Sequence, residues 1–239
     1  MARSRRRRSV SQGVLRQLLE SQLAELIPGE GRALDIVDLG GGTGGLAADL
    51  ASKGHRVTVV DPSPDALASL ERRAVDAKLT SRIIGLQGDA SDLVRLAGER
   101  SADVVVCHRV LEVVDSPAEA LTAMAAVLRP GGVLSLLVSQ RHAVVLSQAL
   151  AGHIVLSRRT FADPRRFDHD HVIGLVQHAG FTVLASHGIG AIAVHVPEAL
   201  IDAEAYAELG ALEAEISQDP TFRALAPHVH VFAQAPISR

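Results

Sequence analysis

The chain has 239 residues, of which 47% are hydrophobic, 21% are charged and 3% are aromatic. This composition excludes disorder over most of the chain, and the length suits one α/β domain with a sizeable core. The formal net charge is −3, but five of the 24 Lys and Arg residues lie within the first eight positions, which leaves 19 cations against 27 acidic residues in the rest. The few aromatic side chains argue against a broad surface for stacking nucleic-acid bases.

The chain starts with a basic segment, and we expect residues 1–10 to form a disordered arm before a single domain over residues 11–239. The arm can follow nucleic-acid phosphates, although a solvated tail or a start site placed too early explains it at least as well. A helix with one apolar face should follow, lie against the core and end near Pro28. That face is formed by Leu15, Leu18, Leu19, Leu23 and Leu26.

From residue 33 onward, short apolar runs alternate with helical patterns, which is typical of a parallel sheet covered by helices. Strands are predicted at 33–39, 56–60, 82–87, 102–107 and 133–138. Helices are predicted at 44–53, 64–78 and 117–128, with a weaker one at 89–99. The order indicates a Rossmann-like α/β fold.

The last third of the chain is predicted to complete the sheet and to carry a lid at about residues 141–168. The lid would consist of a helix at 141–156 and a surface loop rich in Arg, Asp and His at 157–171. The remaining elements are a helix at 169–179, a strand at 181–187, a helix at 198–217 and a strand at 228–234.

A glycine-rich loop follows the first strand, with Asp38 two residues before its first glycine, Gly40. The loop also fits the G-x-G-x-x-G spacing of dinucleotide enzymes, so spacing alone leaves the ligand open. A carboxylate here would repel a pyrophosphate, whereas S-adenosylmethionine has no phosphate and carries an ammonium and a sulfonium. The loop therefore favours the methyl donor, with contacts from Asp38, Gly40, Gly41, Gly42 and Gly44.

Two further acidic residues stand at strand ends. Asp61 ends the second strand, 21 residues after Gly40, where a carboxylate can accept both ribose hydroxyls. Capping of the next helix fits Ser63 better than Asp61. After the third strand, Asp89, Ala90 and Ser91 can offer a carboxylate and backbone amides to adenine, although helix capping explains Asp89 equally well.

These motifs, with Leu128-Arg129-Pro130-Gly131-Gly132 before the fifth strand, resemble class I S-adenosylmethionine-dependent methyltransferases over residues 33–138. The resemblance implies a seven-stranded, mostly parallel sheet with an antiparallel last strand, and the strands at 181–187 and 228–234 would close it. It also implies S-adenosylmethionine as the cofactor.

The fourth strand delivers His108 to the carboxyl edge of the sheet, where open α/β proteins bind ligands, so His108 is the candidate catalytic residue. The alternative is a structural histidine bonded to a loop carbonyl. Its neighbour Cys107, the single cysteine, is expected to be a buried strand residue, because methyl transfer needs no covalent enzyme intermediate.

A narrower resemblance spans nearly the whole chain. The segments Gly13-Val14-Leu15-Arg16-Gln17 and His108-Arg109-Val110-Leu111-Glu112, followed by LRPGGVLSLLV, EALIDAEAYAELGALEAEISQDP and HVHVFAQAP, are similar to the bacterial tRNA 5-carboxymethoxyuridine methyltransferases. That family esterifies the carboxylate of a modified wobble uridine. The resemblance implies that Arg16, Asp61 and His108 contact the methyl donor, with Arg16 clamping its methionine carboxylate.

The substrate half departs from that family. Its lysine-rich lid is represented by Arg158, Arg159, Arg165 and Arg166, and its aromatic residues after the fifth strand are replaced by Val138 and Ser139. The four arginines, placed around Phe161 and Phe167, are candidates for binding a tRNA backbone, although a solvated loop fits as well.

The sequence thus predicts a cytoplasmic O-methyltransferase that esterifies 5-carboxymethoxyuridine in tRNA, without membrane association and with the oligomeric state left open. Its carboxylate acceptor is ionised at neutral pH and needs no general base. The alternatives are a small-metabolite methyltransferase and a non-catalytic nucleotide-binding regulator. No metal site is expected, because the neighbouring residues Asp168 to His171 seldom converge on one ion without distant ligands.

Overall fold

The structure is a computed structural model that describes residues 5–26 and 32–237. Contacts between residues divide the chain into two compact units. Unit 1 comprises Met1–Glu30, Val138–Val172 and Ser186–His230, and unit 2 comprises Gly31–Leu137, Ile173–Ala185 and Val231–Arg239. Within the described residues, no helix is both long and apolar enough to cross a bilayer.

The sheet has seven strands in the order β3-β2-β1-β4-β5-β7-β6 and is mostly parallel, with an antiparallel last strand, as the sequence predicts. Strand β1 pairs with β2 and β4, β2 pairs with β3, and β4 pairs with β5, all in parallel. The strands are β1 (Asp35–Leu39), β2 (Arg56–Asp61), β3 (Ile83–Gln87), β4 (Ala102–His108), β5 (Leu128–Ser139), β6 (Thr182–Ile189) and β7 (His228–Gln234). The inner strands β2, β4 and β5 contain apolar runs covered on both faces, since Val59, Val105 and Leu134 have no exposed surface, whereas most of β3 is exposed.

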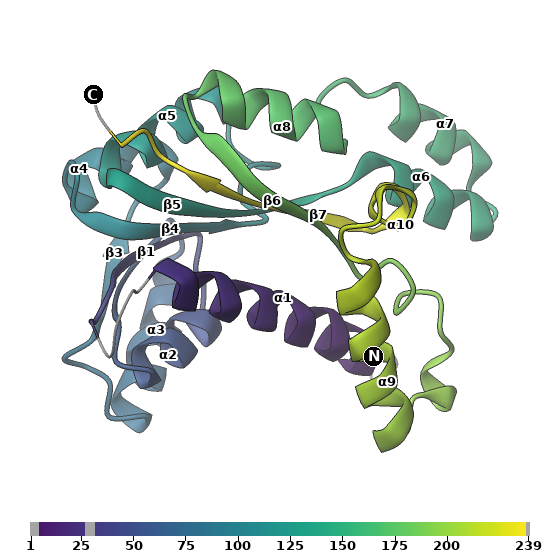
Figure 1. The fold of residues 1–239 in the computed structure, drawn as a ribbon. Helices are drawn as coiled ribbons and strands as arrows, with labels where there is room; N and C mark the ends of the chain where they lie inside the picture. The colour runs from purple at the N-terminus through teal and green to yellow at the C-terminus, as the bar shows by residue number, and fades with distance from the viewer. Residues whose placement is uncertain (1–4, 27–31, 238–239) are drawn as a thin grey trace. The chain divides into compact units, whose positions relative to one another are not determined.

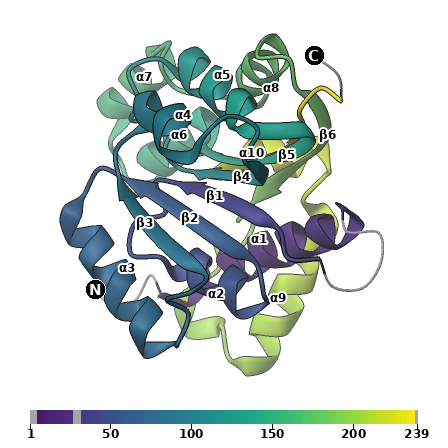
Figure 2. The same cartoon turned by 90° about the vertical axis from the view of Figure 1, so that its left-hand side faces the viewer.

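In unit 2, α2 and α3 cover one face of the strands, and α4 and α5 cover the other (Figures 1 and 2). These helices are α2 (Gly45–Ser52), α3 (Pro64–Asp76), α4 (Leu93–Ala97), preceded by the 3-10 turn η2 (Ala90–Asp92), and α5 (Pro117–Val127). Ser63 and Ser116 cap α3 and α5, and a proline occupies the first turn of each. The parallel strands end at one edge of the sheet. The loops that follow them lead into helices whose first residues are fixed by these caps.

In unit 1, α1 packs against α9 (Figure 1). Val10, Ala193, Ile201 and Leu209 form the buried apolar cluster there. The helices are α1 (Arg5–Leu26), α6 (Arg141–Leu150), α7 (Ile154–Ala162), the 3-10 turn η3 (Glu198–Leu200), α9 (Ala203–Ile216) and α10 (Pro220–Leu225), while α8 (His169–His178) spans both units.

Two segments differ from the sequence prediction. Helix α1 begins at Arg5, so residues 5–10 are helical where we expected a disordered arm, in line with the good helix propensity of Arg. The predicted helix at 141–156 is broken at Gly152, whose φ is 80°, and α7 extends to Ala162 into the predicted loop. Residues 1–4 and the predicted end of the first helix at Pro28 lie outside the described residues.

The prediction of one domain over residues 11–239 stays a prediction. Strands β5, β6 and β7 each begin in one compact unit and end in the other.

Candidate cofactor and active site

The glycine-rich loop after β1 has a backbone that only glycine adopts without strain. Gly40, Gly42 and Gly44 have φ values of 71°, 57° and 74°, all in the left-handed region. A Cβ atom on Gly40 would collide with the side chain of Val110, and one on Gly44 would collide with Leu70. The loop is fixed by the Gly40 N–H, which donates to the Val60 carbonyl at 2.7 Å.

The Asp61 carboxylate connects the end of β2 to this loop. Its Oδ2 accepts the Gly42 N–H and its Oδ1 accepts the Ser63 N–H, both at 2.9 Å. Ser63 in turn caps α3 by accepting the Ala66 N–H at 3.2 Å, as the sequence predicts. Each carboxylate oxygen retains a second lone pair, so Asp61 can still accept hydrogen bonds from a ligand.

A cavity of about 750 Å³ opens at the carboxyl ends of β1, β2, β3 and β4, all within unit 2. This volume is in the range of small-molecule and cofactor sites. Five of the residues predicted to bind the cofactor line it, namely Gly40, Asp61, Asp89, Ala90 and Ser91. The strand ends therefore bring three separate sequence motifs to one place.

The rest of the wall was missed in the sequence analysis. Apart from Pro62, which follows β2, it comes mainly from the turn after β4 and from α5, and it includes Arg109, Val110, Val113, Val114, Asp115, Ser116, Glu119, Ala120 and Ala123. The turn directly follows His108, so its position after a parallel strand was the available signal.

Asp89 both caps a turn of the backbone and forms part of the cavity wall. Its Oδ1 accepts the Ser91 N–H at 2.8 Å and the Ser91 hydroxyl at 2.6 Å, and this capping holds η2. The Ser91 hydrogen bonds lower the pKa of Asp89, so the cavity wall carries an ionised carboxylate here. Capping and a place in the cavity wall are therefore compatible.

His108 lies at the end of β4, and its Nε2 is 2.9 Å from the hydroxyl of the buried Ser135 on β5. Burial lowers the pKa of His108 to about 4, so the ring is neutral at physiological pH. The Nε2 contact is with a strand hydroxyl, whereas the structural alternative anticipated a loop carbonyl, and His108 is not among the residues that line the cavity. Cys107 is fully buried, which raises the pKa of its thiol, in agreement with the expected strand role.

Asp38 ends up behind the loop, with only 3% of its surface exposed. Burial and the nearby negative charge of Asp61 raise the pKa of Asp38 to about 7. The carboxyl group therefore changes between neutral and charged within the physiological pH range.

Residues 37–136 match the sequence family described as a methyltransferase domain. The chain is an S-adenosylmethionine-dependent methyltransferase. It is 28% identical over 236 residues to the tRNA 5-carboxymethoxyuridine methyltransferase of Escherichia coli K12, covering 95% of this chain and 89% of that protein. It is also 33% identical over 162 residues to a ubiquinone biosynthesis O-methyltransferase of Methylobacterium nodulans, covering 66% and 63% of the two chains.

The fold agrees with solved methyltransferase structures. One is the 1,6-didemethyltoxoflavin-N1-methyltransferase of Burkholderia thailandensis, crystallised with S-adenosylhomocysteine, with a TM-score of 0.55 and 19% identity over 98% of this chain and 79% of that one. The cofactor of the present methyltransferase is S-adenosylmethionine. The carboxylates of the cavity suit a ligand with two cationic groups and no phosphate.

The raised pKa of Asp38 leads to a prediction about the methyltransferase. The pKa of Asp38 is about 7 in the folded chain and near its ordinary value of 3.8 in the unfolded chain, so burial of this carboxyl makes the fold less stable as the pH rises between these values. Asp38→Asn should therefore raise the free energy of unfolding at pH 8 by roughly 1–4 kcal/mol and change it little at pH 4. Urea denaturation at the two pH values measures this, and an equal effect at both would contradict it.

The predicted substrate residues of the methyltransferase lie in unit 1, as does Arg16 on α1. Arg158 and Arg159 are on α7, and Arg165 pairs with Asp163, with Nε and Oδ1 at 3.1 Å. Phe161 is 60% exposed, with the Arg141 guanidinium 5.8 Å from its ring centre, whereas Phe167 is only 3% exposed.

Of the two phenylalanines among the lid arginines, only Phe161 is accessible, and Phe167 is buried. Its ring is buried against His171, with ring centres 5.5 Å apart. The neighbouring acidic and imidazole groups are engaged in the fold, since Asp168 pairs with Arg141 and accepts the His171 N–H, and His169 bonds Asp170 and Ser186.

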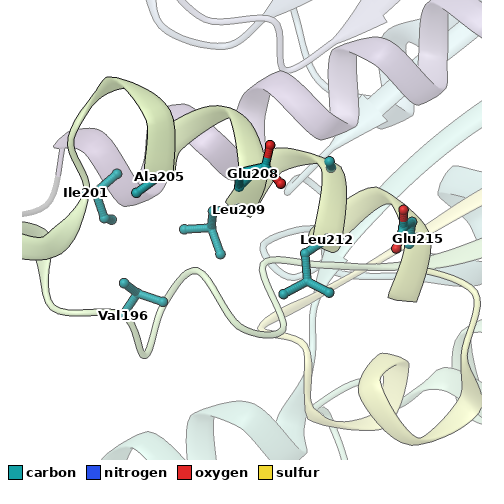
Figure 3. A pocket seen from close by; sticks show the side chains of 8 residues that line it. Val196, Ile201, Ala205, Glu208, Leu209, Leu212 and Glu215 are labelled. Carbon is teal, nitrogen blue, oxygen red and sulfur yellow. The ribbon is translucent and has the colours of Figure 1, made fainter.

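Unit 1 also has an open groove along α9 (Figure 3). Its wall is apolar except for two carboxylates, and the labelled residues are Val196, Ile201, Ala205, Glu208, Leu209, Leu212 and Glu215. None of the predicted cofactor residues lines it, so the cavity of unit 2 is the candidate site.

Proposed function

We propose that this methyltransferase esterifies the carboxylate of 5-carboxymethoxyuridine at the wobble position of tRNA, in the cytoplasm. The observation that carries the proposal is the similarity to the Escherichia coli tRNA 5-carboxymethoxyuridine methyltransferase, which extends over 95% of the chain and beyond the methyltransferase domain at residues 37–136.

In this proposal the residues of unit 2 bind and orient the methyl donor. Asp61 would accept the ribose hydroxyls, Asp89 to Ser91 would contact adenine, and the glycine loop, with the Asp38 carboxyl buried behind it, would face the cationic methionine part. Arg16 would clamp the methionine carboxylate. The cofactor supplies an activated methyl group, and transfer would proceed by in-line displacement, for which proximity and orientation are the main contributions.

The proposed chemistry needs no general base, because a carboxylate acceptor is already ionised at neutral pH. This agrees with a His108 that is neutral above its pKa of about 4 and is held by Ser135. In the proposal His108 positions the reacting groups and moves no proton at neutral pH.

The His108→Ala variant is therefore expected to lower turnover about ten- to a hundredfold without adding or removing a pKa in the kcat profile between pH 6 and 8. A pH series of initial methylation rates on tRNA measures both quantities. Turnover equal to that of the unaltered enzyme would contradict the role, and a turnover pKa in that range that disappears in the variant would instead identify a proton transfer by His108.

Mass spectrometry of tRNA nucleosides from cells with and without the gene tests the proposed function. We expect 5-carboxymethoxyuridine to accumulate without its methyl ester in the deletion strain, and the gene to restore the ester. Unchanged nucleosides would contradict the proposal.

A second candidate is methylation of a small metabolite, which is favoured by the 33% identity to the ubiquinone biosynthesis O-methyltransferase. A phenol acceptor has an ordinary pKa of about 10 and requires a base, in contrast to a carboxylate. Label transferred from the donor to a small-molecule extract, and none to tRNA, would favour this candidate. A non-catalytic regulator would transfer label to neither.

A further inference from the structure

The turn after β4 carries a residue with an unusual backbone conformation at the cavity. Arg109 has a φ of 63°, in the left-handed region that residues other than glycine seldom adopt. Its N–H donates to the Leu137 carbonyl of β5 at 2.7 Å, which fixes the turn to the sheet. Such conformations cost free energy and cluster at functional sites. The side chain of Arg109 is exposed and lines the cavity.

Arg109 differs in charge from the other residues that line the cavity. Four acidic residues belong to the wall, Asp61, Asp89, Asp115 and Glu119. Arg109 is the one cation among the residues described as lining it, and His108 beside it is neutral because burial lowers its pKa to about 4. Within the described chain, no hydrogen bond or ion pair engages the guanidinium of Arg109.

A negatively charged acceptor would meet repulsion from these carboxylates. The N-terminus of α5 offers little relief, because Asp115 and Glu119 flank it and offset the positive end of its helix dipole. A guanidinium binds a carboxylate through two parallel hydrogen bonds, which fixes orientation as well as charge.

We infer that Arg109 forms the binding site for the acceptor carboxylate, so that it selects anionic acceptors and holds the carboxylate oxygen toward the methyl group. The inference rests on the proposed function, since it assumes a carboxylate as the acceptor. It assigns a role to a residue that the sequence analysis did not single out.

The experiment compares Arg109→Gln and Arg109→Lys with the control Arg100→Gln. Arg100 is also an exposed arginine of unit 2 with a positive φ, 49°, but it does not line the cavity. The control therefore matches the loss of charge and the backbone conformation. The substrate is tRNA from a strain that lacks the gene, and the affinity for S-adenosylmethionine is measured by calorimetry on each variant.

We expect Arg109→Gln to lower kcat/KM for tRNA about ten- to a hundredfold, with a Kd for the cofactor within about twofold of the unaltered enzyme. The kcat/KM of Arg109→Lys should lie between those of Arg109→Gln and the unaltered enzyme, because Lys keeps the charge but loses the paired hydrogen bonds. Arg100→Gln should leave both quantities unchanged. An intact cofactor Kd also shows that the variants are folded.

Two results would overturn the inference. Equal kcat/KM in Arg109→Gln and Arg100→Gln would show that Arg109 does not hold the acceptor, and a parallel loss of cofactor affinity would show that it binds the methionine carboxylate instead. If the unaltered enzyme transfers no methyl group to tRNA that carries the free carboxylate, the proposed function itself is wrong, which is a separate outcome.

Discussion

Replacing Asp61 with Ala is expected to lower the affinity for S-adenosylmethionine about ten- to a hundredfold. In the proposed binding mode the carboxylate accepts hydrogen bonds from both ribose hydroxyls, and charged hydrogen bonds of this kind contribute roughly 1.5–3 kcal/mol. The change also removes the bonds from Gly42 and Ser63 that connect the glycine loop to the end of β2. Both effects lower the affinity for S-adenosylmethionine.

Calorimetry with S-adenosylmethionine and with NAD measures this effect. Asp76→Ala is a matched control, because Asp76 is an exposed acid at the last position of α3 and does not line the cavity. Asp61→Asn separates the two contributions, since an amide oxygen can still accept one backbone N–H but the negative charge is lost. An unchanged affinity in Asp61→Ala, or tighter binding of NAD than of the methyl donor, would contradict the proposed binding mode.

The part of the site that sequence predicts well depends on local geometry. Asp61 is the last residue of β2 and Asp89 follows shortly after the end of β3, and parallel strands bring such positions to one edge. Ser63 and Pro64 likewise mark the start of α3 within a few residues of sequence. These features depend on strand periodicity and helix capping, which can be recognised from a single sequence.

The missed features depend on residues that are distant in the chain. The left-handed backbone of Arg109 is fixed by the Leu137 carbonyl on another strand. The raised pKa of Asp38 requires burial behind the glycine loop and the proximity of Asp61. Phe161 and Phe167 have the same chemistry, yet only tertiary packing decides which of them is buried. A sequence pattern contains no direct signal for any of these.

Substitution of the lid arginines is expected to cause the largest loss of methylation of the proposed tRNA substrate. The chain outside its first residues is acidic, yet residues 141–162 contain no Asp or Glu. Within this stretch Arg158 and Arg159 lie on α7, whose apolar side chains Ile154, Val155 and Phe161 are 62%, 69% and 60% exposed. An exposed surface that combines cations with apolar and aromatic groups is suited to a phosphate backbone with accessible bases.

Reversal of Arg158, Arg159, Arg165 and Arg166 to Glu should therefore abolish methylation of tRNA. The Kd for S-adenosylmethionine should change by less than about twofold, because none of these arginines lines the cofactor cavity or is predicted to contact the cofactor. Since Arg165 already pairs with Asp163, we expect the double variant Arg158→Glu with Arg159→Glu to account for most of the loss. The matched control reverses Arg72 and Arg100, two exposed arginines outside the lid.

Salt dependence separates phosphate binding from other causes of lost activity. Each neutralised phosphate releases counterions, so the logarithm of the tRNA association constant should fall steeply with the logarithm of salt concentration for the unaltered enzyme. The double variant should bind more weakly and show a shallower slope, smaller by roughly 0.7 for each lost phosphate contact to a single strand. Filter binding of tRNA from the deletion strain at several salt concentrations, with radiolabelled donor in a parallel assay, gives both quantities. Labelling of tRNA by the quadruple variant at the unaltered rate would show that the lid does not bind RNA, whereas the same loss in the control pair would assign the effect to net charge alone.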